Sequence, residues 1–125
     1  MIRFVVLDLD HLQLACPKNS EETARAFYGG LLGLTELEKP EPLRARGGCW
    51  FQLGSIQLHL GVEEPFRAAA KAHPAFAVAS VKDAFARLEG AGVPCKWDDA
   101  LPGVERFFVA DPWGNRLEFL ESTDK

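Results

Sequence analysis

Alternating apolar and polar residues recur along this chain, separated by stretches with helical spacing. Period-two alternation is typical of a strand with one buried face, whereas apolar residues three and four positions apart indicate a helix. In the first half, strands are predicted at residues 7–15, 36–39, 49–53 and 56–60. A helix with Phe27 and Leu31 on its apolar side follows the first strand, and Gly33 is placed to end it. Asn19 or Ser20 is expected to cap its first turn.

The same order of elements repeats in the second half. Strands are predicted at residues 73–79, 94–97, 104–110 and 115–120. Ser80 begins a helix, with Asp83 three residues further on as in a capping box. The repetition predicts an α+β fold of two βαβββ modules. The modules are expected at about 5–61 and 73–121, with a linker over 61–72, and together they form one domain over 1–125.

Composition narrows the functional classes. The net charge is −4 and the chain has no long basic run, which argues against a nucleic-acid partner. No run approaches the roughly 20 apolar residues of a membrane span, and Asp8 and Asp10 interrupt the apolar N-terminus before it could act as a signal peptide. Cys16, Cys49 and Cys95 are odd in number and lack a C-x-x-C pair, so we expect reduced thiols in the core of a cytoplasmic protein.

The three histidines supply the candidate chemistry. His11, His59 and His73 each fall on the polar side of an alternating run, and Glu118 has the same kind of position in the last strand. If these runs line one curved sheet, three imidazoles and a carboxylate converge in a concave pocket. Such a set of donors suits a divalent transition metal.

Five runs of residues carry a resemblance to a known family. They are D-H-L at 10–12, F-Y-G-G-L-L-G-L at 27–34, L-H-L at 58–60, H-P-A-F-A-V at 73–78 and D-P-W-G-N-R-L-E at 111–118. Together they resemble the vicinal oxygen chelate superfamily, which contains glyoxalase I, extradiol dioxygenases, fosfomycin-modifying thiol transferases and bleomycin-binding proteins. The resemblance covers roughly residues 7–121 and implies a cupped mixed β-sheet with the helices outside.

The resemblance also implies a ligand set for a metal. Ligands in the family come from the first and fourth strands of each module, which correspond here to His11, His59, His73 and Glu118. Zn, Ni, Co, Fe and Mn all suit such donors. His59 departs from glyoxalase I, which more often has Glu or Gln there, so it is interpreted as a fourth ligand or as a base. Gln57, on the same face, is an alternative ligand or hydrogen-bond donor.

For function, the resemblance implies a metal-dependent enzyme acting on a small substrate with adjacent oxygens. The best interpretation is a glyoxalase I-like isomerase or lyase, with Glu118 or His59 as the catalytic base. The alternatives are an extradiol-type dioxygenase and a non-catalytic protein that binds a small molecule such as an antibiotic. Phe108 stands where the phosphonate-handling members have Tyr, which argues against fosfomycin chemistry.

The sequence also leads to expectations about partners and about the roles of the remaining cations and tryptophans. We expect a homodimer with neither nucleic acid nor membrane as a partner, and the site is built either within one chain or across two. Four cations are interpreted as surface charges rather than as an anion site: Arg67, Lys71, Arg106 and Arg116. The three tryptophans are interpreted first as core residues and second as pocket walls: Trp50, Trp97 and Trp113.

Overall fold

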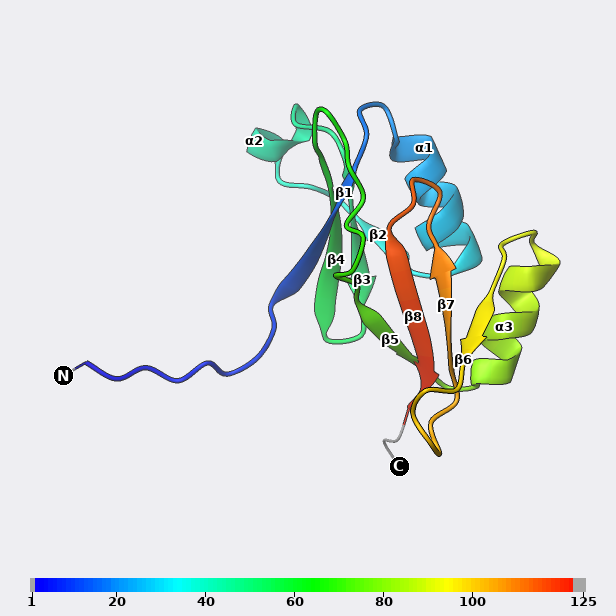
Figure 1. Ribbon diagram of the computed structural model, residues 1–125. Helices are drawn as coiled ribbons and strands as arrows, with labels where there is room; N and C mark the ends of the chain where they lie inside the picture. The colour runs from blue at the N-terminus through cyan, green and yellow to red at the C-terminus, as the bar shows by residue number, and fades with distance from the viewer. Residues whose placement is uncertain (1, 123–125) are drawn as a thin grey trace.

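The strands of the computed structural model, which describes residues 2–122, form two four-stranded sheets (Figure 1). The first sheet has the order β1-β4-β3-β2, with β1 (His11–Cys16), β2 (Thr35–Leu37), β3 (Cys49–Leu53) and β4 (Ile56–Val62). The second has the order β5-β8-β7-β6, with β5 (Ala75–Val78), β6 (Lys96–Asp98), β7 (Arg106–Ala110) and β8 (Arg116–Glu121).

Both sheets are paired in the same way. The first and last strands of each module, β1 with β4 and β5 with β8, run parallel, and the other neighbours run antiparallel. The structure therefore confirms an α+β fold of two βαβββ modules. The strands predicted at 49–53 and 56–60 form a hairpin, with Leu53 paired to Ile56 across a turn in which Gly54 has φ +56°. The single domain expected over 1–125 extends at both ends beyond the described residues and stays a prediction.

The capping hydrogen bond predicted at Ser80 is present, whereas the helix of the first module has none. α3 (Val81–Gly90) begins as expected, because the Ser80 side chain accepts a hydrogen bond from the Asp83 amide at 3.1 Å. The helix of the first module starts as α1 (Glu21–Ala24) and continues as the π-helix η1 (Arg25–Leu31). Ser20 occupies the N-cap position as predicted, but its side chain makes no capping hydrogen bond, because the hydroxyl donates to the Pro17 carbonyl at 2.6 Å instead. A short helix, α2 (Glu41–Arg44), lies between β2 and β3, where no helix was predicted.

Several strand boundaries differ from the prediction. The first strand was expected from residue 7 but begins at His11, because its neighbour β4 starts at Ile56 and pairs Gln57 with His11. Residues 2–10 therefore have no neighbouring strand, and they extend away from both sheets as an apolar arm, which is the blue segment in Figure 1. β5 begins at Ala75, so His73 precedes the strand on which it was expected.

One face of each sheet is buried and the other is open. Phe51 and Leu58 of the first sheet pack in the core with Tyr28 of η1, and Phe107 and Leu117 of the second sheet lie in the same core. Burying a side chain of this size contributes roughly 1.5–3 kcal/mol. The opposite faces carry the polar side chains of the strands, so the candidate site must lie there. No helix among residues 2–122 is both long and apolar enough to cross a membrane.

Candidate functional site

The two sheets place the predicted ligands at equivalent positions. His11 lies two residues before Gln13, which pairs with His59 across β1 and β4. His73 lies two residues before Ala75, which pairs with Glu118 across β5 and β8. Alternate residues of an extended chain share a face, so each open face brings one candidate residue at the start of the first strand of its module, or just before it, next to one from the last strand.

In the first module, His11 and His59 stack on each other. Their ring centroids are 4.4 Å apart, and Trp50 of β3 stacks on the other side of His59 at 3.9 Å with nearly parallel planes. His59 is 5% exposed, and Gln57 Oε1 lies 2.9 Å from its Nε2. Burial and the neighbouring His11 lower the pKa of His59 below its ordinary value, which favours the neutral imidazole that metal binding and base catalysis both need.

In the second module, His73 and Glu118 form a direct contact. His73 Nε2 lies 2.9 Å from Glu118 Oε1, and the carboxylate is 5% exposed. Phe108, which pairs with Glu118 across β7 and β8, meets the His73 ring edge-on at 5.2 Å. Phe108 thus holds the position over Glu118 that Trp50 holds over His59.

A third residue, Arg106 of β7, completes the second cluster. Its guanidinium lies 3.3 Å from Glu118 Oε2 and 3.6 Å from Asp98 Oδ2. The side chain is only 18% exposed, so its interpretation as a surface charge is wrong. The sequence could have indicated this position, because Arg106 lies two residues before Phe108 and the two side chains therefore share one face of the strand. Trp50 likewise lines the open face rather than the core.

The four predicted ligands therefore form two pairs. Within residues 2–122, no group of three or more His, Cys, Asp and Glu side chains lies close enough to hold a metal ion. Convergence of all four in a single chain was one of the two arrangements left open, and this structure does not contain it. The proposal that His11, His59, His73 and Glu118 are ligands stays a prediction.

The hydrogen bonds of the histidines suit a metal ion. His73 Nδ1 lies 2.9 Å from the Lys71 carbonyl, which can only accept, so Nδ1 carries a proton. In a neutral ring Nε2 then presents a lone pair to the Glu118 carboxylate at 2.9 Å, and two acceptors in contact need either a proton or a metal ion between them. His11 is held in the same way, because Asp10 Oδ1 lies 2.9 Å from its Nδ1.

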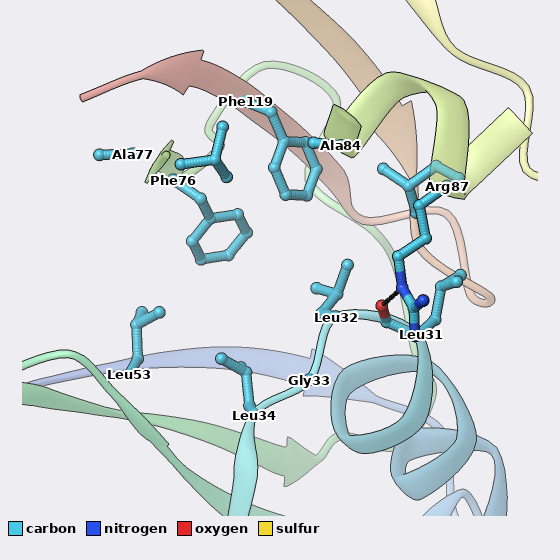
Figure 2. A pocket seen from close by; sticks show the side chains of 12 residues that line it. Leu31, Leu32, Gly33, Leu34, Leu53, Phe76, Ala77, Ala84, Arg87 and Phe119 are labelled. Carbon is cyan, nitrogen blue, oxygen red and sulfur yellow. Dashed lines mark hydrogen bonds between the residues drawn. The ribbon is translucent and has the colours of Figure 1, made fainter. Parts of the chain in front are cut away.

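An apolar groove between the two modules is a separate feature. Figure 2 shows Leu34 and Leu53 of the first module facing Phe76 and Phe119 of the second across a space of about 340 Å³. Arg87 at its rim donates hydrogen bonds to the carbonyls of Leu31 and Gly30, the last at 3.1 Å. None of its lining residues is a His, Cys, Asp or Glu, so the groove adds no metal ligand or carboxylate base to the candidate site.

Comparison with known proteins shows which family and which solved structures this chain is similar to. The family model described as the Glyoxalase/Bleomycin resistance protein/Dioxygenase superfamily matches residues 8–119. A solved structure of a protein from Bacillus anthracis assigned to the glyoxalase family is 46% identical, covers 98% of this chain and 100% of its own, and superposes with a TM-score of 0.92. No curated protein matches the chain.

More distant structures share the fold. A glyoxalase family protein from Enterococcus faecalis is 26% identical, with 91% of this chain and 97% of that chain covered and a TM-score of 0.71. A fosfomycin resistance protein from Listeria monocytogenes is 17% identical, with 95% and 96% covered and a TM-score of 0.75. At such low identity the second comparison supports the fold alone.

Proposed function

This chain belongs to the Glyoxalase/Bleomycin resistance protein/Dioxygenase superfamily, and from that premise we propose that it is a metal-dependent enzyme of the vicinal oxygen chelate type. Its substrate is a small molecule with two adjacent oxygens, and its reaction is a glyoxalase I-like isomerisation or lyase step. The observation that carries the proposal is the equivalent placement of the His11–His59 and His73–Glu118 pairs on the open faces of the two sheets.

His11, His59, His73 and Glu118 are the proposed ligands of one divalent transition metal. The metal, when bound, would act as a Lewis acid that holds both substrate oxygens and stabilises the negative charge that develops on them. Zn, Ni, Co, Fe and Mn remain the candidates, because imidazole and carboxylate donors accept all five.

Glu118, or His59 where its imidazole is not a metal ligand, is the proposed base for moving a proton between adjacent carbons. His59 suits this role because burial and its neighbour His11 keep its pKa low and its ring neutral. Trp50 and Gln57 restrict the ring to one orientation by stacking and by a hydrogen bond. Glu118 is held by His73 and Arg106 on its two oxygens, so its carboxylate is also fixed in direction.

A second copy of the chain is the proposed means of joining the two pairs. β1 and β5 are edge strands of their sheets, and His11 lies on the first and His73 just before the second. A two-fold axis that sets β1 of one copy beside β5 of the other would bring the complementary pairs together. The exposed arm supports this assembly, because Ile2, Phe4 and Leu7 leave large apolar side chains 84–95% exposed.

Membership of the superfamily and the free cysteines support two further proposals, one on the reaction and one on the location of the protein. An extradiol-type dioxygenase is the second candidate, since His11, His73 and Glu118 supply the two-histidine, one-carboxylate set that Fe(II) oxygenases use. We also place the protein in the cytoplasm, because Cys16, Cys49 and Cys95 are free thiols, as expected in a reducing compartment.

The experiment is elemental analysis of protein purified without chelator, followed by two activity assays. We expect up to one divalent ion per chain in the wild type and little in His73→Ala. Turnover of methylglyoxal–glutathione hemithioacetal would support the isomerase, and oxygen consumption with a catechol would support the dioxygenase. If the wild type binds no divalent ion even after supplementation, the proposed function is wrong. Metal binding without either activity would support the remaining alternative, a small-molecule binding protein.

A further inference from the structure

The open face of the second sheet carries more cations than carboxylates. Cross-strand pairing puts Lys96 opposite Phe108 and Phe108 opposite Glu118, so all three share this face. Arg106 and Arg116 lie two residues before Phe108 and Glu118 and therefore share it too. With Asp98, which pairs with Arg106, the face has three basic side chains against two acidic ones. This positive surface stands out in a chain whose net charge is −4.

Both carboxylates on this face are already engaged. Glu118 contacts His73 and Arg106, and Asp98 contacts Arg106. Among residues 2–122, no hydrogen bond or ion pair reaches the Arg116 guanidinium; its contact is with the Phe108 ring, whose centroid lies 4.2 Å from its Cζ. The same ring meets His73 edge-on at 5.2 Å, so Arg116 is fixed beside the candidate metal ligands rather than extended into solvent.

From this arrangement we infer that Arg116 is the centre of an anion-binding site that receives a carboxylate or phosphate group of the substrate. Phe108 covers one face of the guanidinium and leaves its edge, which carries the N–H donors, available for a bidentate contact with oxyanion oxygens. Arg106 adds positive charge on the same side of the sheet, because its Cζ lies 5.4 Å from the centroid of the same Phe108 ring.

The first module makes the complementary contribution. Its open face presents Trp50, Gln52 and Gln57 around His59, with no Lys, Arg, Asp or Glu at these positions of β3 and β4. Lys39 and Arg46 line a hollow of the first module beside Trp50 and Gln13, but the arginine that stacks beside the His73–Glu118 pair belongs to the second module. The charged end of the substrate is therefore expected beside Arg116. This inference rests on the proposed function for the identity of the substrate site, and it narrows the substrate to an anion.

The test uses metal-free protein, so that failure of the metal proposal and failure of the anion site can be distinguished. Wild type, Arg116→Gln, Arg116→Lys and Arg67→Gln are titrated with inorganic phosphate, with acetate and with chloride at matched ionic strength. Nitrogen–proton NMR follows the arginine Nε–H signals and the backbone amide signals. The amide signals measure anion binding in the variants that lack the Arg116 signal and also report whether each variant is folded. Arg67→Gln is the matched control, since Arg67 is an exposed arginine on the linker between the modules.

We expect phosphate or acetate to shift the Arg116 Nε–H signal saturably, with chloride having little effect. Arg116→Gln should weaken that binding roughly tenfold or more, Arg116→Lys should restore part of it, and Arg67→Gln should match the wild type. Tighter binding of acetate would indicate a carboxylate substrate and tighter binding of phosphate a phosphorylated or phosphonate one. Wild-type affinity in folded Arg116→Gln, or shifts that only follow ionic strength, would overturn the inference.

Discussion

The Tyr28 hydroxyl donates a hydrogen bond to Asp111 Oδ2 at 2.7 Å, and this contact joins the helix of the first module to the β7–β8 turn of the second. Both side chains are buried. Asp111 also accepts from the amides of Trp113 and Asn115, and the Asn115 side-chain amide links the carboxylate to the Ala15 carbonyl of β1. The D-P-W-G-N turn is therefore part of the junction between the modules, not only a connection between two strands.

Tyr28→Phe should lower the free energy of unfolding by about 1–3 kcal/mol, because it leaves a buried carboxylate oxygen with one donor fewer. Burial and the Asp111 carboxylate raise the pKa of Tyr28 well above its ordinary value, so the hydroxyl keeps its proton across the usual pH range. Urea unfolding measures the change. Asp111→Ala removes every hydrogen bond to the buried carboxylate and should cost more than Tyr28→Phe, whereas Asp99→Asn, at an exposed position, should cost little. Equal stability of Tyr28→Phe and wild type would contradict this role.

Stability of the metal-free protein should fall as the pH drops through the ordinary His value of 6.5, partly because of His59. Its pKa is lower in the folded than in the unfolded state, so the unfolded chain binds a proton first and gains stability from it. Urea unfolding at about pH 7.5 and about pH 5.5 measures the loss. This loss of stability between the two pH values should be smaller in His59→Gln than in the wild type. An equal loss in the two proteins would contradict a buried neutral His59 imidazole.

The thiols should react slowly in the native protein. Burial raises the pKa of Cys49 to about 11 and, with the nearby Glu89, that of Cys95 also to about 11, so neither is a thiolate at neutral pH. When a thiol reagent is added to the native protein at about pH 8, we expect no cysteine to react rapidly and the half-buried Cys95 to react slowly. After unfolding, all three thiols should react. Cys95→Ser should abolish the slow phase. A rapid native equivalent would show that a cysteine is activated.

Arg106→Met should weaken metal binding roughly 10- to 100-fold, the usual cost of losing a residue that orients a ligand. The guanidinium holds Glu118 Oε2 at 3.3 Å while His73 approaches Oε1, so its removal frees the carboxylate to rotate. The absorption spectrum and affinity of bound Co(II) measure the effect, with Arg67→Met as the control. Arg106→Lys should retain part of the affinity. Unchanged Co(II) binding in Arg106→Met would exclude the positioning role.

The module repeat and the open faces could be predicted from the sequence because both follow from local periodicity. Alternation put Leu12 and Leu14 on the core side of β1 and left His11 on the other side, as the structure has them. The cap at Ser80 depends on residues within three positions and was predicted for the same reason.

Other features depend on partners that are distant in sequence and therefore could not be predicted. Residues 7–10 at the end of the apolar arm alternate like a strand, but strand formation needs a neighbour, and β4 is too short to supply one. The roles of Asp111 and Arg106 arise from contacts with Tyr28 and Glu118. Local pattern likewise did not indicate that His11–His59 and His73–Glu118 would form two separate pairs, because the relative placement of the modules is not a local property.

Metal content of mixed variants tests the central claim most directly. His11→Ala/His59→Ala disables the first-module pair, and His73→Ala/Glu118→Ala disables the second. We predict that neither variant binds a divalent ion alone. After unfolding and refolding together they should recover about a quarter of the wild-type metal content, because half of the dimers are mixed and each mixed dimer holds one intact site of two. No metal in the refolded mixture, with the wild type refolded in parallel and fully loaded, would contradict a site built from two copies.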